Sequence, residues 1–182
     1  VNPSHFENDS TDQLNVTWLG HSSLMINIDG YKILTDPVFE TRVSIFGPTR
    51  FNGDVPLNPD SLKEIDVVVI SHDHYDHLNK YSIIHLMDRT KQFVVPLKVG
   101  ALLLKWGVPE DKVTELNWGD EYRFDNRLTL TATPAQHFSG RGLRDHRKRL
   151  WASWVIRSEH HKVFYSGDSG YLSGFKQIGD EH

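Results

Sequence analysis

The segment from Ser71 to His77 carries the pattern H-x-H-x-D-H, in which His72, His74, Asp76 and His77 are potential metal ligands. Imidazole nitrogen and carboxylate oxygen suit zinc, iron or manganese, and a catalytic site leaves coordination positions open for water. An apolar run precedes the segment and a helical pattern follows it. Side chains on such a tight strand-to-helix turn can converge on one point, so the pattern predicts a catalytic metal centre.

Two further segments place a ligand-type residue directly after a predicted strand. His137 ends the segment Thr133–His137, and Asp168 ends the segment Ser166–Asp168. Sites on sheet scaffolds usually lie just beyond strand ends. We therefore expect His137 and Asp168 to join the histidine-rich turn.

The elements that must position these residues are mostly short strands, with a central region in which strands and helices alternate. Asp29-Gly30 is a strong hairpin signal, and the stretch 36–59 reads as a long irregular loop of a functional kind. Alternation of strands and helices indicates a sheet covered by helices. The predicted strands are 15–19, 22–28, 31–35, 65–70, 92–95, 113–117, 121–124, 128–133, 151–156 and 162–165, and the predicted helical segments are 61–64, 78–89, 97–106 and 172–178.

Composition narrows the class of protein. The 182 residues are 38% hydrophobic and 24% charged, as in an ordinary globular domain, and the net charge of -4 argues against a nucleic-acid partner. The sequence has no cysteine, which excludes thiol chemistry and suits the cytoplasm. We expect no signal peptide and no transmembrane segment, because the apolar runs are far shorter than the roughly 20 residues that a membrane span needs.

Several other motifs accompany the histidine-rich turn: Thr17–Ser23, Leu34–Pro37, Gly47–Phe51, Leu150–Trp154 and Ser166–Tyr171. With them the sequence resembles the metallo-β-lactamase superfamily, and within it the N-acylphosphatidylethanolamine-hydrolysing phospholipase D enzymes and their bacterial relatives. The resemblance implies one α+β domain over residues 15–182, a four-layer αββα sandwich, preceded by a polar extension over residues 1–14.

The resemblance also implies a ligand set. His72, His74 and His137 would hold the first metal, Asp76 and His77 the second, and Asp168 would bridge the two. Two zinc ions are expected, with manganese or iron as alternatives. The family pattern has one more histidine for the second metal, and His182 follows Asp168 too closely to match it. We therefore expect the chain to lack the C-terminal part of the second half of the fold.

The implied activity is metal-dependent hydrolysis, most specifically that of a phospholipase D-like phosphodiesterase in which a metal-bound hydroxide attacks phosphorus. A lactone or ester hydrolase of the same fold is the alternative within enzymes, and an inactive metal-binding fragment is the alternative outside them. The expected partner is a small-molecule or lipid phosphodiester. Peripheral membrane contact and homo-oligomer formation stay open.

Four residues in or near the ligand set call for an interpretation. Asp76 and Asp73 are the candidate catalytic carboxylates, Asp76 as a metal ligand and Asp73 as a group that orients a histidine or relays a proton. A plain position at a helix start is the alternative for Asp73. For His21 and Asp36 we favour structural or supporting roles over direct metal binding.

Three residues are candidates for substrate contact. Arg144 and Arg147 lie in a cationic segment, 140–149, soon after His137, where they could face a phosphate group. A solvated surface loop is the alternative reading of that segment. Phe46, in the long irregular loop, is a candidate for contact with an acyl chain, and packing onto the core is its alternative.

Overall fold

Two β-sheets form the centre of the protein, as seen in a computed structural model that describes residues 12–42, 49 and 57–182. The first sheet has six strands in chain order, antiparallel from β1 to β3 and parallel from β3 to β6. Its strands are β1 (Leu14–Gly20), β2 (Ser23–Ile28), β3 (Tyr31–Thr35), β4 (Ile65–Val69), β5 (Thr90–Pro96) and β6 (Val113–Leu116).

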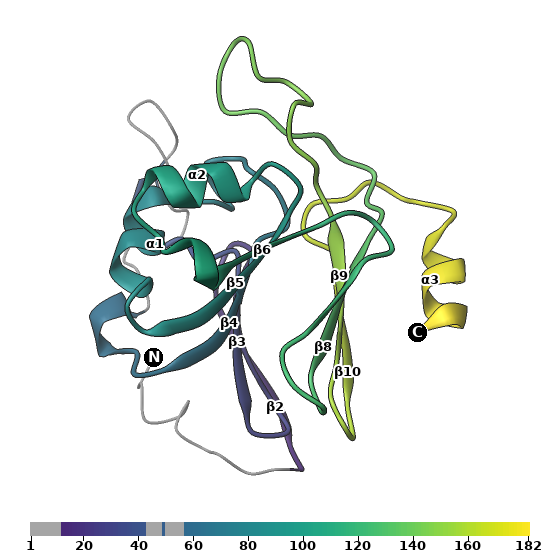
Figure 1. Ribbon diagram of the computed structural model, residues 1–182. Coiled ribbons are helices and arrows are strands. Elements are labelled where there is room, and N and C mark those ends of the chain that lie inside the picture. The colour runs from purple at the N-terminus through teal and green to yellow at the C-terminus, as the bar shows by residue number, and fades with distance from the viewer. Residues whose placement is uncertain (1–11, 43–48, 50–56) are drawn as a thin grey trace.

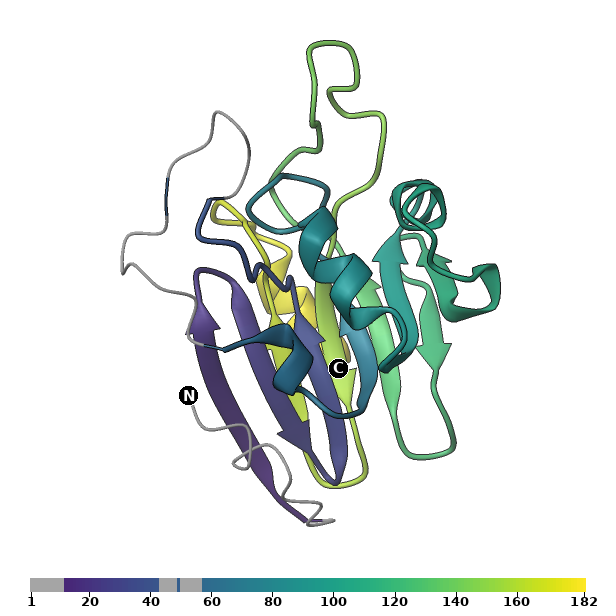
Figure 2. The ribbon, with the colours of Figure 1, turned by 90° about the vertical axis from the view of Figure 1, so that its left-hand side faces the viewer.

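The second sheet is antiparallel throughout and lies face to face with the first (Figure 1). Its order is β10-β9-β8-β7, with β7 at Glu121–Arg123, β8 at Thr129–Thr133, β9 at Ser153–Arg157 and β10 at Lys162–Tyr165. Helices α1 (Lys80–Leu86) and α2 (Gly100–Lys105) cover the outer face of the first sheet (Figure 2), and α3 (Phe175–Glu181) lies outside the second. The expected αββα layer order is confirmed.

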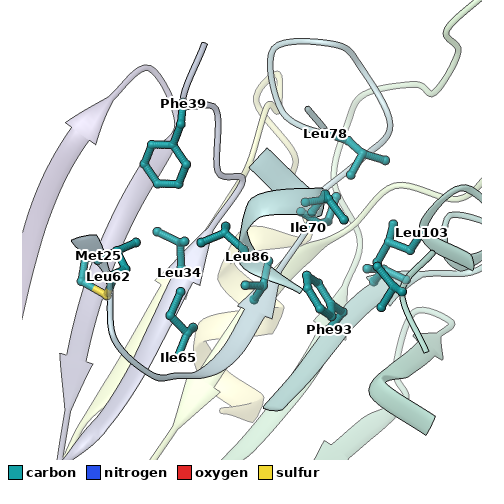
Figure 3. Close-up of a cluster of buried hydrophobic side chains, with 14 of the residues drawn as sticks. Met25, Leu34, Phe39, Leu62, Ile65, Ile70, Leu78, Leu86, Phe93 and Leu103 are labelled. Atoms are coloured by element: carbon teal, nitrogen blue, oxygen red, sulfur yellow. The ribbon is translucent and has the colours of Figure 1, made fainter. Parts of the chain in front are cut away.

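Strand β4 shows how the layers are held together. Val68 packs toward the helices, whereas Val67 and Val69 pack between the two sheets, and all three are fully buried. Successive side chains of a strand point to opposite faces, so one apolar strand supplies both cores. On the helix side, Phe93 and Leu86 belong to the same cluster (Figure 3).

The helices start later than the sequence predicts. Asn79 caps α1 by accepting a hydrogen bond from the Ser82 backbone N–H at 2.8 Å, so the helix begins at Lys80 instead of residue 78. The backbone N–H of Leu97 bonds to Leu116 O in the sheet, which delays α2. The sequence predicts a helical turn over 61–64, whereas the structure has a 3₁₀ turn at Pro59–Ser61. None of the helices in the described ranges is long and apolar enough to cross a bilayer.

A buried carboxylate joins the two sheets at the end opposite the histidine-rich turn. Asp29, in the β2–β3 hairpin turn, accepts hydrogen bonds from Ser158 Oγ at 2.5 Å, His160 N at 2.8 Å and His161 Nδ1 at 2.7 Å, all beside the β9–β10 turn. Burial opposes its ionisation, but these donors lower the pKa of Asp29 to about 2. Asp29 and Gly30 both have positive φ, at 47° and 87°, as the predicted Asp-Gly turn requires.

Candidate metal centre

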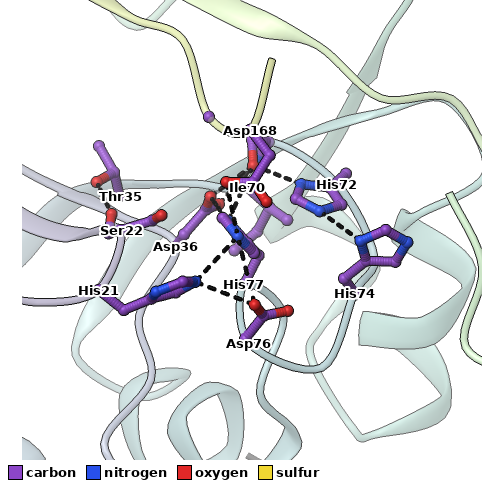
Figure 4. Close-up of polar contacts among 12 residues, drawn as sticks. His21, Ser22, Thr35, Asp36, Ile70, His72, His74, Asp76, His77 and Asp168 are labelled. Carbon is purple, nitrogen blue, oxygen red and sulfur yellow. Dashed lines mark hydrogen bonds and ion pairs between the residues drawn. The ribbon is translucent and has the colours of Figure 1, made fainter. Parts of the chain in front are cut away.

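The candidate centre is built where several strands end on the same side of the molecule. The histidine-rich turn follows β4, Asp36 follows β3, and Asp168 lies beyond β10. His21 enters from the turn between β1 and β2 (Figure 4). Because neighbouring parallel strands end at the same edge of a sheet, residues far apart in the chain meet there.

Three histidines form the first cluster. His137 Nε2 lies 3.1 Å from His72 Nε2 and 3.2 Å from His74 Nδ1, and the latter two atoms are 2.9 Å apart. In a tetrahedral zinc site with bonds of about 2.0–2.1 Å, neighbouring ligand atoms are about 3.3 Å apart. The three nitrogens therefore fit one cation, which is the grouping that the family resemblance implies for these residues.

The protonation of this cluster also suits a metal. Burial, together with the neighbouring histidines, lowers the pKa of His72 to about 2. Burial likewise lowers the pKa values of His74 and His137. All three imidazoles are therefore neutral near pH 7, which is the form that binds a cation.

Asp76, His77 and Asp168 form a second cluster beside the first. His77 Nε2 lies 3.2 Å from Asp168 Oδ1 and 3.9 Å from Asp76 Oδ2. Asp168 Oδ2 lies 3.9 Å from His137 Nε2, so the two oxygens of this carboxylate face the two clusters. This arrangement is the one expected of a bridging aspartate, and it supports the predicted ligand set.

Asp36 fixes the ring of His77 from behind. His77 Nδ1 donates to Asp36 Oδ2 at 2.7 Å, and the same oxygen accepts from Ser71 Oγ at 2.5 Å and from Tyr165 Oη at 2.6 Å. Asp36, Ser71 and His77 are at most 1% exposed. A carboxylate that binds the far nitrogen of a ligand histidine orients the ring and sets its tautomer. The supporting role that the sequence favours for Asp36 stays a prediction, and this hydrogen bond is an observation in its favour.

The electrostatics of the second cluster differ from those of the first. Burial opposes protonation of His77, but its hydrogen bonds to Asp168 and Asp36 outweigh burial and raise its pKa to about 10. The same contact with His77 lowers the pKa of Asp168 to about 2. His77 therefore carries a proton that a bound cation must displace, and cation binding at this cluster is coupled to pH.

The role expected for Asp73 is different in the structure. Its fully buried carboxylate accepts from Gly140 N and Arg149 Nη1, both at 2.7 Å. Among the described residues no hydrogen bond joins this carboxylate to a histidine. Arg141 Nη1 adds bonds to the Asp73 and Leu78 carbonyls at 2.7 Å. Asp73 thus ties segment 140–149 to the histidine-rich turn through its bonds to Gly140 and Arg149.

The cationic segment 140–149 divides into inner and outer residues. The inner residue Arg141 bonds to the Asp73 and Leu78 carbonyls, and the inner residue Arg149 pairs with the Asp73 carboxylate. Arg144 and Arg147 are exposed, and no salt bridge within the described part of the chain engages either. Both therefore stay candidates for an anionic substrate. Phe46 lies outside the described residues.

Gly167 brings Asp168 into the centre. A Cβ built on Gly167 would lie 2.4 Å from Ser71 Cβ, and its φ of +55° falls in the left-handed region. Only glycine permits this close approach at low cost. The Ser166–Asp168 segment predicted from the sequence therefore needs its glycine to reach the histidine-rich turn.

Sequence reasoning missed the residues that support the ligands. Tyr165 and Ser71 bond to Asp36, and Arg141 bonds to the Leu78 carbonyl beside the histidine-rich turn. Nothing in the sequence around these three residues indicates such a role. Their partners lie between 35 and 129 positions away. The one signal in the sequence was that several ligand-type residues directly follow predicted strands.

Comparison with known proteins gives the family and several relatives of this chain. A model described as "Beta-lactamase superfamily domain" matches residues 31–182. An uncharacterized protein of Mycobacterium tuberculosis is 43% identical, with 100% of this chain and 49% of the relative covered. N-acyl-phosphatidylethanolamine-hydrolyzing phospholipase D 1 of Caenorhabditis elegans is 36% identical, with 94% and 51% covered.

A solved structure gives the same picture for the fold. Igni18, a metallo hydrolase from Ignicoccus hospitalis, superposes with a TM-score of 0.66 at 24% identity, over 92% of this chain and 66% of its own. The chain spans about half the length of the curated relatives named above, at 49% and 51%.

Proposed function

This chain belongs to the metallo-β-lactamase superfamily, and we propose that its metal centre hydrolyses phosphodiesters, with N-acylphosphatidylethanolamine-like lipids as the substrate class. The observation that carries the proposal is the pair of adjacent ligand clusters, His72/His74/His137 and Asp76/His77, with Asp168 between them. Two bound divalent cations would supply an activated water and charge stabilisation at phosphorus. Zinc is the cation we propose, because histidine nitrogen and carboxylate oxygen are common zinc ligands; iron and manganese, which the same donors suit, are the alternatives.

The chain's own residues prepare the site for such chemistry. Asp36 holds the His77 ring with Nε2 toward Asp168, and the buried Asp73–Arg149 pair holds the segment that follows His137. A centre held this firmly keeps its donors in place during reaction, which is the source of most electrostatic catalysis.

Two observations favour a phosphodiester over a lactone or simple ester. Arg144 and Arg147 extend from a segment that is tied directly to the histidine-rich turn through Asp73, and both cations are exposed. An anionic phosphodiester gains from such cations, whereas a neutral lactone does not. The Caenorhabditis elegans relative, 36% identical, is named as a phospholipase D that hydrolyses N-acylphosphatidylethanolamine.

The test compares substrates on the purified, zinc-loaded chain. Release of p-nitrophenol from bis(p-nitrophenyl) phosphate and of phosphatidic acid from N-acylphosphatidylethanolamine micelles should be measurable and should disappear in His72→Ala. Hydrolysis of a lactone and of p-nitrophenyl acetate is measured in parallel. Turnover of these carbonyl substrates without phosphodiester turnover would replace the proposal with an esterase function, and no turnover at all would remove it.

The two arginines, Arg144 and Arg147, give a second test of the proposal. The double change Arg144→Ala/Arg147→Ala should raise KM for the phosphodiester about tenfold, equivalent to about 1.4 kcal/mol, and leave KM for the lactone unchanged. The matched control is Arg123→Ala/Arg157→Ala, which removes two arginines at the opposite end of the second sheet. Equal effects of the two double variants would contradict a specific role for Arg144 and Arg147.

A further inference from the structure

We propose that His21 is a direct ligand of the second cation, together with Asp76 and His77. His21 Nε2 lies 3.0 Å from Asp76 Oδ2 and 3.3 Å from His77 Nε2. The candidate donor atoms of the three residues all lie within 4.8 Å of one another. The family ligand pattern described above has no place for this residue, and the sequence favoured a supporting role for it.

The distances match shared coordination. Ligand atoms around tetrahedral zinc lie about 3.3 Å apart, and the His21–His77 nitrogen pair has this spacing, as do the nitrogens of the first cluster. The two rings meet edge to face, with an interplanar angle of 70°, so that their Nε2 atoms face the same space (Figure 4).

The tautomer of His77 adds a chemical reason. Its Nδ1 donates to Asp36, so once a cation has displaced the proton on Nε2, that nitrogen presents a lone pair toward His21. Asp76 presents a carboxylate oxygen to the same place, with Oδ2 3.0 Å from His21 Nε2. Two imidazole nitrogens and a carboxylate oxygen that converge in this way form a donor set for a cation.

The backbone holds His21 in this position. Gly20 and His21 have consecutive positive φ values of 106° and 49°, which form the tight turn after β1. Histidine tolerates this region better than most residues. Trp18 Nε1 donates to His21 O at 2.8 Å and secures the turn from the strand side. The His21 side chain, half exposed at 50%, leans toward Asp76 instead of solvent.

The second cation would therefore be bound by the nitrogens of His21 and His77 and by the carboxylate of Asp76. Asp168 would be the ligand that the two cations share. The inference concerns metal binding alone and does not depend on the identity of the substrate. Failure of the phosphodiester assay would leave it intact.

The test counts ions and identifies donors. Metal-free protein is titrated with Zn²⁺ by calorimetry, and ions per chain are measured by atomic emission. We expect two ions for the wild-type chain and one for His21→Ala, with the affinity of the second site lowered at least a hundredfold. The matched control is His85→Ala, which removes a partly exposed histidine of α1 that pairs with Asp60.

If His21 only supported Asp76 through a hydrogen bond, His21→Ala would also weaken the site. Coordination of the metal by the His21 imidazole must therefore be observed directly. With ¹¹³Cd²⁺ in place of zinc, scalar coupling between the second cadmium and the His21 imidazole is expected, in addition to coupling with His77. Coupling to His77 without coupling to His21 would overturn the proposal. Two ions of unchanged affinity in His21→Ala, or a single ion in the wild-type chain, would overturn it as well.

Discussion

Replacing Asp73 by alanine separates two interpretations of this carboxylate. If it relays protons, the substitution lowers turnover and leaves the fold unchanged. If it ties segment 140–149 to the histidine-rich turn, the substitution lowers stability first. The structure supports the second interpretation, because Asp73 is fully buried and bonded to Gly140 N and Arg149.

The magnitude follows from what the substitution leaves behind. Removing one partner of a buried ion pair costs about 3–5 kcal/mol, because the other charge loses its compensation. Here Arg149 keeps Asp145 at 2.9 Å, and its side chain is 20% exposed. The expected loss is therefore at the lower end, about 3 kcal/mol in the free energy of unfolding. Because His137 lies close before Gly140, we also expect zinc affinity at the first cluster to fall about tenfold.

Urea unfolding of the metal-free chain, followed by tryptophan fluorescence, measures the first quantity, and calorimetric titration with zinc measures the second. The control is Asp60→Ala, which breaks a surface pair with Arg89 at 3.4 Å and should cost less than about 1 kcal/mol. A loss below about 1 kcal/mol in Asp73→Ala, with turnover abolished and zinc binding intact, would refute the structural role and restore the proton relay.

Three further predictions concern charge, backbone and metal. The pKa of Asp29 is lowered to about 2 in the folded chain, so its contribution, about 2 kcal/mol, is present above the unfolded pKa near 3.8 and lost as pH falls toward 2. Unfolding of Asp29→Asn should show that deficit at pH 7 and converge with wild type in acid; a constant difference would contradict it. Gly167→Ala should push the backbone at residue 167 away from Ser71, displace Asp168 and weaken the second zinc site at least tenfold by calorimetry, whereas Gly179→Ala, with open space around it, should not. Zinc at about a hundredfold excess over its dissociation constant should stabilise the chain by about 3 kcal/mol, and His72→Ala should lose most of this gain in the same unfolding assay.

Local sequence was sufficient for the parts of the fold that depend on neighbours in the chain. The Asp29-Gly30 turn, the doubly buried strand β4 and the strand-to-helix turn that carries His72 and His74 are all where the sequence predicts them. Helix starts were predicted less well. The capping bond of Asn79 and the sheet contact of Leu97 depend on details of geometry that apolar periodicity does not contain.

By itself, the sequence determined the chemistry of this protein: the donor types, their grouping after strand ends, and the family that they indicate. Tertiary structure decided which residues share a partner. His21 and His77 are 56 positions apart, Asp36 and His77 are 41 apart, and Asp73 and Arg149 are 76 apart. These pairs meet only when strand register brings separate strand ends to one edge, and register depends on the packing of both cores. For that reason the sequence could propose the ligands but not show that Asp73 bonds to Arg149, or that His21 lies beside Asp76 and His77.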